Sequence, residues 1–473
     1  MAEPSEHPQP CPRCVVLERR VAELERQLAA ALARIGELER LLDQRTRDAK
    51  RQAAPFSKGA PKDQPHKPGR KPGSDYGTQA FRALPEAPPD QILDVKMPKR
   101  CPSCGGSVRE THVARQFQIE IPRRPILRRF DLHVGRCTCC GKHVQPRHEL
   151  QTSDALGAAA VQIGPDAQAL IAGLKNKLGL SYADITTLMK DAWDIPLTRG
   201  AAAHIVRRAG ERAESMYAAL KAMIPQRDTV YPDETGWKIN GRLHWLWDFV
   251  TDVCTLYVIR PSRGVDVPGE VLGMDYAGRM THDGWAPYDR FTHARHQQCL
   301  THLLRRAKEI IAQLPGRAAR FAGKVKVFLL HALGLRNRRR DGRIGDHGYA
   351  MARGRLERHA TEEGAGRLDR LLAARPRGKL CRTFRNHLDK HRDQLLTFLY
   401  EEDIEASNWP AEQAIRPAVL NRKVFGGNRT WTGAHALEVL ASLFATCRQN
   451  AIDALTLLSN LLRAPCLPRP TTA

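Results

Sequence analysis

The stretch that decides the fold is TVYPDETGWKINGRLHWLWDFVTDVCTLYV, residues 229–258, which places an acidic pair beside strand-forming residues. Its segments TVYP, RLHWLWDFV and CTLYVIR are rich in β-branched and aromatic residues, and the turn-like segments GWKING and TDV separate them. Such residues suit a pleated, half-buried surface, so we predict three short strands that form a meander. The acidic pair, Asp233 and Glu234, is expected at the end of the first strand.

The composition favours a polyanionic partner. The 473 residues include 75 Lys+Arg and 51 Asp+Glu, which gives a formal net charge of +24. A positive surplus binds phosphates and releases their counterions, so nucleic acid is the first partner to expect. An unrelated basic protein and an anionic membrane surface are the alternatives. The length suits about three domains.

The sequence carries no signal for a membrane or for secretion. No apolar run approaches the ~20 residues of a membrane span, and the polar start MAEPSEHPQPCPRC does not resemble a signal peptide. We therefore expect a cytoplasmic protein with no membrane partner. Cysteines stay reduced in that compartment, so the twelve cysteines point to metal binding rather than to disulfides.

The N-terminal part has a heptad pattern followed by a low-complexity segment. Apolar residues recur every three or four positions from Leu17 to Leu42, which predicts a coiled coil over residues 15–52 that joins two or more copies of the chain. A single amphipathic helix packed on its own chain is the alternative. Residues 53–90 lose this periodicity and gather Pro, Gly, Lys and Arg, which predicts a basic disordered linker.

Two CxxC pairs predict a zinc ribbon over residues 91–150. Four thiolates on two tight turns satisfy tetrahedral Zn²⁺ and close its coordination shell, so the site would be structural. The expected ligands are Cys101, Cys104, Cys137 and Cys140. Cys139 and His143 are competing ligands. A third pair, Cys11 and Cys14, has no second pair nearby and is interpreted as free or dimer-bridging.

The segment between the two pairs carries the ribbon's expected strands. ARQFQIEI at 114–121 and ILRRFDLHV at 126–134 have strand-like composition. Their basic residues would let the ribbon contact DNA. These are Arg123, Arg124, Arg128 and Arg129.

Residues 165–217 change to helical periodicity. Ser181 is a plausible N-cap for one helix and Thr198 for the next, and DIPL joins them, which is typical of a helix-turn-helix. The basic residues of the second helix, Arg199, Arg207 and Arg208, are the expected DNA contacts. Ordinary helical packing is the alternative explanation of the same pattern.

Two further acids suit a metal site with Asp233. Asp283 directly follows the short strand GRMTH, with Asp275 and Asp289 as rivals. Glu412 falls on the first turn of a helix that starts at Asn408-Trp409-Pro410, because proline suits the first helical position. A solvated glutamate that merely stabilises the helix start is the alternative for Glu412.

Three carboxylates are the donor set that two-metal phosphoryl transfer requires. Hard carboxylate oxygens are preferred by Mg²⁺, and a pair of such ions activates the attacking oxygen and stabilises the leaving oxygen. Mn²⁺ is an alternative ion. Asp233 is the expected first ligand, with Glu234 as an alternative or supporting group, in the position where an RNase H-like core needs an acid. The basic residues Arg416, Arg422 and Lys423 would hold DNA phosphates beside the metal.

A long basic segment separates Asp283 from Glu412. Its stripes of apolar residues predict a helical insertion over residues 293–402 between two parts of a core, 228–292 and 403–463, with a tail at 464–473. His296, Cys299 and His302 look like metal ligands, but on one helix they would cover too wide an arc. Packing or DNA contact is the favoured explanation.

Six motifs together point to one family: KPGRKPG at 67–73, the CPSCGG and CTCCG knuckles, DETGW at 233–237, HDGWAPYDRF at 282–291, HQQCLTHLLRRAKE at 296–309 and AEQAIRPAVLNRKVFGGN at 411–428. In these motifs the chain resembles the transposases of the insertion-sequence sixty-six family. The resemblance implies a DDE transposase that cuts and joins DNA at the terminal inverted repeats of its own element. Carried over by motif, its acids are Asp233, Asp283 and Glu412. Trp409 departs from the family's commoner second asparagine.

The expected architecture is therefore multidomain α+β. It comprises a coiled coil, a zinc ribbon, a helix-turn-helix-like region and an RNase H-like α/β core with a helical insertion. The resemblance also implies small accessory proteins as partners and a place at the bacterial nucleoid. The rival hypothesis is a catalytically inactive or domesticated DNA-binding protein with the same zinc and helix-turn-helix modules.

Overall fold

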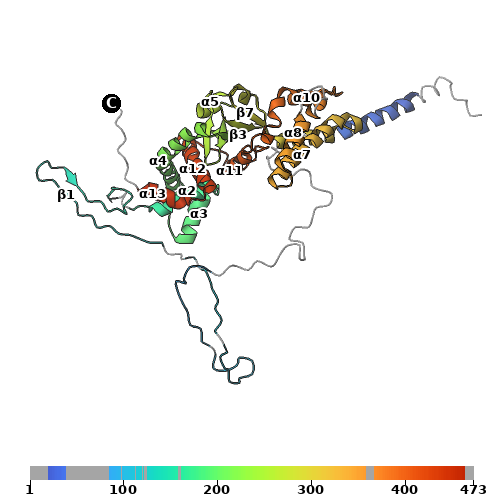
Figure 1. Cartoon of the computed structure of the whole chain (residues 1–473). Coiled ribbons are helices and arrows are strands. Elements are labelled where there is room, and N and C mark those ends of the chain that lie inside the picture. The colour runs from blue at the N-terminus through green and yellow to red at the C-terminus, as the bar shows by residue number, and fades with distance from the viewer. Residues whose placement is uncertain are drawn as a thin grey trace, which may run out of the picture. The chain divides into compact units, whose positions relative to one another are not determined.

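The computed structural model describes most of the chain in two separate units. The described residues are 20–38, 85–96, 98–111, 113–119, 121, 125–157, 161–357 and 367–463. The units are Met1–Ile119 and Glu120–Ala473, and each is considered by itself (Figure 1). Several predictions fall wholly or mostly outside the described residues: Cys11 and Cys14, most of the linker, Arg123 and Arg124, and the tail.

In the first unit, residues 20–38 form a helix, in agreement with the heptad pattern. Its apolar stripe is half exposed in the single chain: Val21, Leu24, Leu28, Leu32, Ile35 and Leu38 each expose 50% to 61% of their surface. Pairing of this helix with a second copy stays a prediction. None of the described helices has the length and apolar character needed to cross a membrane.

The two cysteine knuckles have the same local turn. In the first unit the backbone N–H of Gly105 donates to the carbonyl of Cys101 at 2.9 Å, and Gly105 has φ 73°. In the second unit Gly141 donates to Cys137 at 2.9 Å, with φ 68°. Only glycine adopts this backbone readily, and the turn leaves both sulfurs of a pair available. Zinc binding by these knuckles stays a prediction.

The strands expected between the knuckles are not formed in the part of that segment that the structure describes. Only two-residue strands flank the second knuckle, β1 (Gly135–Arg136) and β2 (His143–Val144), which pair antiparallel. Apolar side chains of the expected strands are exposed, with Leu127 at 96%. Alternating apolar residues specify a strand only where a core buries one face.

A five-stranded mixed sheet forms the centre of the second unit (Figure 1). Its strands are β3 (Thr229–Ile239), β4 (Arg242–Val250), β5 (Thr255–Arg260), β6 (Arg279–His282) and β7 (Arg295–Gln298). The spatial order is β5-β4-β3-β6-β7. The first three strands are antiparallel, and β6 and β7 run parallel to β3. This sheet is compatible with the α+β catalytic core that the resemblance implies.

The predicted meander is confirmed, with one change in its first strand. β3 continues through Asp233 to Ile239, and the reversal comes at Asn240-Gly241, where φ is 49° and 74°. Two residues with positive φ match the twist of paired strands, which is why an Asn-Gly pair makes the tight turn. Asp233 therefore lies within β3 and not at its end.

The helical part of the second unit is extensive. The α-helices are α2 (Pro165–Asn176), α3 (Tyr182–Trp193), α4 (Arg199–Met223), α5 (Asp266–Leu272), α6 (Leu300–Gln313), α7 (Arg320–Arg340), α8 (Asp346–Glu357), α9 (Arg367–Leu372), α10 (Lys379–Lys390), α11 (Trp409–Phe425), α12 (Trp431–Gln449) and α13 (Ala454–Arg463). The 3-10 helices are η3 (Ile224–Gln226), η4 (Ala286–Arg290), η5 (Gly316–Ala319), η6 (Arg392–Gln394) and η7 (Thr397–Leu399).

Both predicted N-caps of the helix-turn-helix-like region are confirmed. Ser181 forms a capping box with Asp184, and the Thr198 side chain accepts from the N–H of Ala201. The second helix, α4, runs to Met223, and its middle packs on α12. A Cβ built at Gly210 of α4 would lie 3.0 Å from Ala436 of α12, so glycine is what permits this approach.

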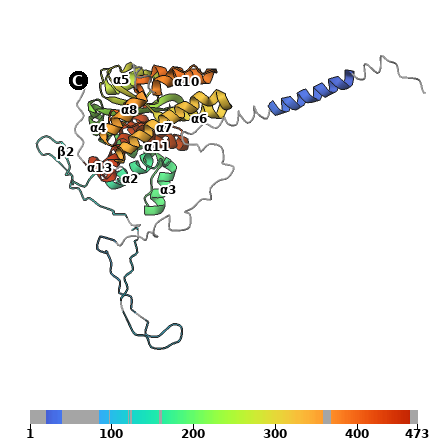
Figure 2. The ribbon, with the colours of Figure 1, turned by 45° about the vertical axis from the view of Figure 1, so that its right-hand side comes forward.

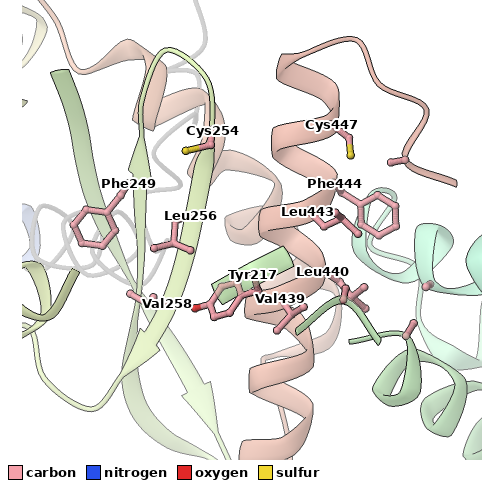
Figure 3. Close-up of a cluster of buried hydrophobic side chains, with 14 of the residues drawn as sticks. Tyr217, Phe249, Cys254, Leu256, Val258, Val439, Leu440, Leu443, Phe444 and Cys447 are labelled. Atoms are coloured by element: carbon pink, nitrogen blue, oxygen red, sulfur yellow. The ribbon is translucent and has the colours of Figure 1, made fainter. Parts of the chain in front are cut away.

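One large core joins α2–α4, the sheet, α12 and α13, as Figure 3 shows in part. There Phe249, Leu256 and Val258 of the strands and Tyr217 of α4 gather with Val439 and its neighbours of α12. A second cluster lies between the sheet and α11. The helices α6–α10 enclose a third cluster of their own (Figure 2). That separate core agrees with a helical insertion, although residues 295–298, expected to be helical, form β7.

Candidate active site

The acidic pair of β3 faces both sides of the sheet. Side chains alternate along a strand, so Asp233 shares its face with Tyr231 and Trp237, whose cluster packs against α11. Glu234 points to the opposite face, on the side of Val230 and the larger core. The two neighbouring carboxyl groups therefore have different surroundings and different partners.

Glu234 is fully engaged by other side chains. Its side chain is 2% exposed, and Arg263 donates to Oε1 through Nε at 2.9 Å and Nη2 at 2.7 Å. The Tyr288 hydroxyl donates to Oε2 at 3.0 Å. Burial, and secondarily the negative charge of Asp283, raises the pKa of Glu234. Because both oxygens already have partners, Glu234 supports the site and Asp233 is the better candidate ligand.

Asp233 is hydrogen-bonded to the backbone. Its Oδ1 accepts from the backbone N–H of Glu234 at 2.9 Å. Burial, followed by the negative charges of Glu234 and Asp283, raises the pKa of Asp233 to about 8. The charge of Asp283, which directly follows β6, acts on Asp233 of β3, and β3 and β6 are paired neighbours in the sheet.

A further acid in this place, Asp248, was missed in the sequence. It lies directly opposite Asp233 in the β3–β4 register, is 0% exposed, and neither of its oxygens has a hydrogen-bond partner among the described residues. Burial, and then the charge of Asp233, raises its pKa well above the ordinary range. The sequence does carry a signal for Asp248, because it is a charged residue within the aromatic segment RLHWLWDFV. Aspartate is almost never fully buried in a core unless it is paired.

Asp283 directly follows β6, as predicted. Its Oδ1 accepts from the N–H of Trp285 at 2.8 Å, which fixes the carboxyl at the start of the loop. Its two rivals are placed differently. Asp275 is exposed in the loop before β6, and Asp289 is paired with Lys390 of α10 at 2.7 Å. Asp283 is thus the acid of this region that neighbours Asp233.

Glu412 lies on the first turn of α11, and the predicted helix start at Trp409 is confirmed. The helix start is tied to β3, because the Asn408 side chain donates from Nδ2 to the carbonyl of Pro232 at 2.8 Å across 176 residues of sequence. Pro232 precedes Asp233, so this bond brings the start of α11 to the strand that carries the first acid.

His302 links the acids electrostatically. Its Nε2 donates to Oε1 of Glu412 at 3.2 Å, and this bond, with a contribution from Asp283, raises the pKa of His302 against the opposing effect of burial. The charge of His302 in turn lowers the pKa of Asp233. The imidazole of His302 therefore interacts electrostatically with three acids, which come from β3, the end of β6 and α11.

The placement of His302 differs from the sequence argument. His296 lies on β7, Cys299 precedes α6 and His302 lies within α6, so the three do not share one helix. Ligand atoms of Cys299, His302 and Glu412 lie within 4.8 Å of one another. Sequence spacing missed this arrangement because Glu412 joins from 110 residues further along the chain.

The predicted DNA-binding residues have mixed environments. Arg422 is half-buried and donates to the Thr235 hydroxyl at 3.1 Å and to the carbonyl of Gly236, so it also braces β3. Arg207 is ion-paired with Glu211. The others are exposed on the surface: Arg199, Arg208, Arg416 and Lys423. Contact of any of these residues with DNA stays a prediction.

Comparison with known proteins decides the family. The family model described as "Transposase IS66 family" matches residues 160–436, from just before α2 into α12. The chain belongs to the IS66 family of transposases. The matched range includes the sheet, the insertion and α11, and so all the acids described above. No curated protein matches the chain. Membership of the IS66 family supports a transposase role and, with it, DNA as a partner and a DNA-processing activity.

Proposed function

We propose that this IS66-family transposase cleaves DNA strands and joins them at the terminal inverted repeats of an insertion sequence, with Asp233, Asp283 and Glu412 as its catalytic acids. The observation that carries the proposal is the Asn408–Pro232 hydrogen bond together with the His302–Glu412 contact. These contacts support a site in which an acid of α11 joins the acids of β3 and β6. The antiparallel meander followed by two parallel strands supports an RNase H-like core.

The acids fit a divalent cation. Burial, and then the charges of Glu234 and Asp283, raises the pKa of Asp233, and a bound cation would favour its ionised form; hard carboxylate oxygens are the donors that Mg²⁺ and Mn²⁺ take. Asp233, Asp283 and Glu412 would hold the metal, and Asp248 lies directly opposite Asp233 on β4. When bound, Mg²⁺ would supply activation of a water or 3′-hydroxyl and stabilisation of the leaving oxygen.

The chain's own residues prepare this site. Arg263 and Tyr288 keep the neighbouring carboxylate of Glu234 out of the metal's reach. Asn408 fixes the start of α11 against β3, and Trp285 fixes the carboxyl of Asp283. Pre-organised ligands lower the reorganisation that metal binding and catalysis require.

DNA binding and assembly are proposed from the remaining predictions. The exposed Arg199, Arg208, Arg416 and Lys423 would contact phosphates, which would make binding strongly salt-dependent. The knuckle thiols would hold Zn²⁺ in a DNA-contacting ribbon. Backbone N–H groups at Ser103 and Cys104 lower the pKa of Cys101, and those at Cys140 and Cys139 lower that of Cys137. The heptad helix would join copies of the chain, and small accessory proteins would complete the machinery.

A strand-transfer experiment tests the function. Purified protein is incubated with labelled element ends, a target plasmid and Mg²⁺, and new 3′-ends and joined products are measured. Asp233→Asn should abolish both products while end binding is retained, whereas Asp275→Asn, a matched change of an exposed acid, should leave both intact. Equal products from wild type and Asp233→Asn would instead favour a DNA-binding protein without catalysis. Cutting without joining would indicate a plain nuclease.

A further inference from the structure

The start of α6 and the start of α11 are held together by a row of contacts. The backbone N–H of Leu300 donates to the carbonyl of Ala406 at 2.9 Å. The backbone N–H of Asn408 donates to Sγ of Cys299 at 3.2 Å. One turn further along both helices, His302 contacts Glu412 at 3.2 Å. All three contacts lie within residues 299–302 of one segment and 406–412 of the other, and we call this group of contacts the clasp.

The clasp joins the two ends of the helical insertion: the chain leaves the sheet after β7 and returns to it at α11. α6 follows β7 directly, and α11 follows the insertion helices that have their own core. Closing a loop of this length costs chain entropy, which local contacts at its two ends must offset. The Asn408–Pro232 hydrogen bond ties the start of α11 to β3, and the clasp ties it to α6. The clasp therefore helps to determine the position of the third acid.

Each side chain of the clasp has a specific part. Cys299 is 1% exposed, and its sulfur accepts the N–H of Asn408, a residue whose side chain is already bound to β3. An ionised carboxylate only accepts hydrogen bonds, so Nε2 of His302 carries the proton that it shares with Glu412. His302 and Glu412 are 35% and 23% exposed, so the pair remains open to substrate.

We propose that Cys299-x-x-His302 is a positioning device for Glu412: Cys299 anchors the start of α11, and His302 orients the Glu412 carboxylate toward the other acids. The proposal rests on the proposed function, because it assigns Glu412 to the metal site. Neither residue replaces a metal ligand. A glutamate with three rotatable bonds loses rotamer freedom when it binds, and a partner that holds it beforehand removes part of that cost.

The expected effect is on metal affinity. Loss of an outer partner of a metal ligand typically lowers metal affinity roughly 10- to 100-fold. We expect His302→Ala to weaken Mn²⁺ binding by about 10-fold. His302→Gln should restore most of it, because the glutamine amide places a donor where Nε2 stood. In a Glu412→Gln background His302→Ala should add little, since residues that act through each other are not additive.

The test is a Mn²⁺ titration of full-length protein, followed by calorimetry or by the paramagnetic signal of free Mn²⁺. His293→Ala, a change of an exposed histidine before β7, is the matched control and should bind like wild type. Circular dichroism establishes that the variants are folded. Cys299→Ala should weaken Mn²⁺ binding in the same direction, because it frees the start of α11.

The outcomes separate this proposal from the proposed function. A 10-fold loss in His302→Ala, rescue by glutamine and absence of an added effect in Glu412→Gln support the positioning role. Unchanged Mn²⁺ binding in His302→Ala, while Asp233→Asn has lost it, overturns the positioning role and leaves the catalytic acids standing. Unchanged binding in Asp233→Asn as well would overturn both. A loss in His302→Ala that persists undiminished in Glu412→Gln would show that His302 acts independently of Glu412.

Discussion

Replacing Asp233 by asparagine should stabilise the metal-free protein while it destroys activity. The change keeps the shape of the side chain, and the new amide oxygen can still accept the N–H of Glu234. It removes a group whose ionisation burial and two neighbouring acids oppose. Active-site acids that repel one another are held in place at a cost in stability, and the bound cation relieves that cost.

The magnitude follows from the pKa. Asp233 has a pKa of about 8 in the folded protein against 3.8 for an ordinary aspartate. Because the folded pKa is raised, the folded protein holds this proton more tightly than the unfolded chain does. The free energy of unfolding is therefore highest below the unfolded pKa of 3.8 and falls as the pH rises toward 8. Over the roughly three pH units between 3.8 and 7, the free energy of unfolding falls by about 1.36 kcal/mol per unit, which is about 4 kcal/mol in all. Because protonated Asp248 relieves part of the repulsion, we expect Asp233→Asn to gain about 2 to 4 kcal/mol.

Calorimetric unfolding in a chelator measures this gain. At roughly 2 °C per kcal/mol for a domain of this size, the midpoint of Asp233→Asn should rise by about 4 to 8 °C at pH 7. The difference should shrink by more than half at pH 5, because only about one pH unit then separates the pH from the unfolded pKa of 3.8. Mn²⁺ should raise the midpoint of wild type and leave that of the variant nearly unchanged. A variant that is equal to or less stable than wild type in chelator at pH 7 would refute the reasoning.

Three further predictions concern zinc, assembly and pH. Cys101→Ser should release one equivalent of zinc and weaken end binding; metal analysis that finds full zinc content excludes the ribbon ligand set. Leu28→Lys in the heptad stripe should lower the mass measured by light scattering, whereas Glu25→Lys should not, and a wild-type-sized oligomer in both would rule out the coiled coil as the contact. His435 bonds to Glu438 and Glu214, which raise its pKa to about 9 from 6.5. The stability that these bonds contribute is fully present below pH 6.5 and is lost as the pH rises above 9. In denaturant titrations, His435→Ala should therefore lower the free energy of unfolding by up to about 1 kcal/mol at pH 6 and by almost nothing at pH 10. An equal loss at both pH values would contradict this.

Local signals in the sequence predicted the helix starts and the meander well. A capping serine, a capping threonine and a proline after Trp409 act through backbone groups within a few residues, so their effect does not depend on the rest of the fold. The aromatic and β-branched segments likewise predicted β4 and β5. The extent of β3 was wrong, because its pairing with β4 continues to the Asn240-Gly241 turn.

Segments whose conformation depends on distant partners were predicted less well. β7 was expected to be helical, and its four residues form a strand because β6 offers a parallel edge. The strands expected near Ile126 have no core to bury them and are not formed in the described residues there. Asp248 passed unnoticed because its meaning comes only from Asp233 on the neighbouring strand.

The amino-acid sequence by itself determined the family, the positive charge and the helix starts, and it singled out three widely separated acids as candidates, because motifs and local backbone chemistry are written in consecutive residues. Only the tertiary structure decided that Arg263 and Tyr288 bind both oxygens of Glu234, and that α11 returns to β3. Those facts depend on hydrogen bonds such as Asn408 to Pro232 and His302 to Glu412, which join residues more than a hundred positions apart. Packing of the insertion and closure of the chain around it bring such pairs within reach, and no local pattern encodes that distance.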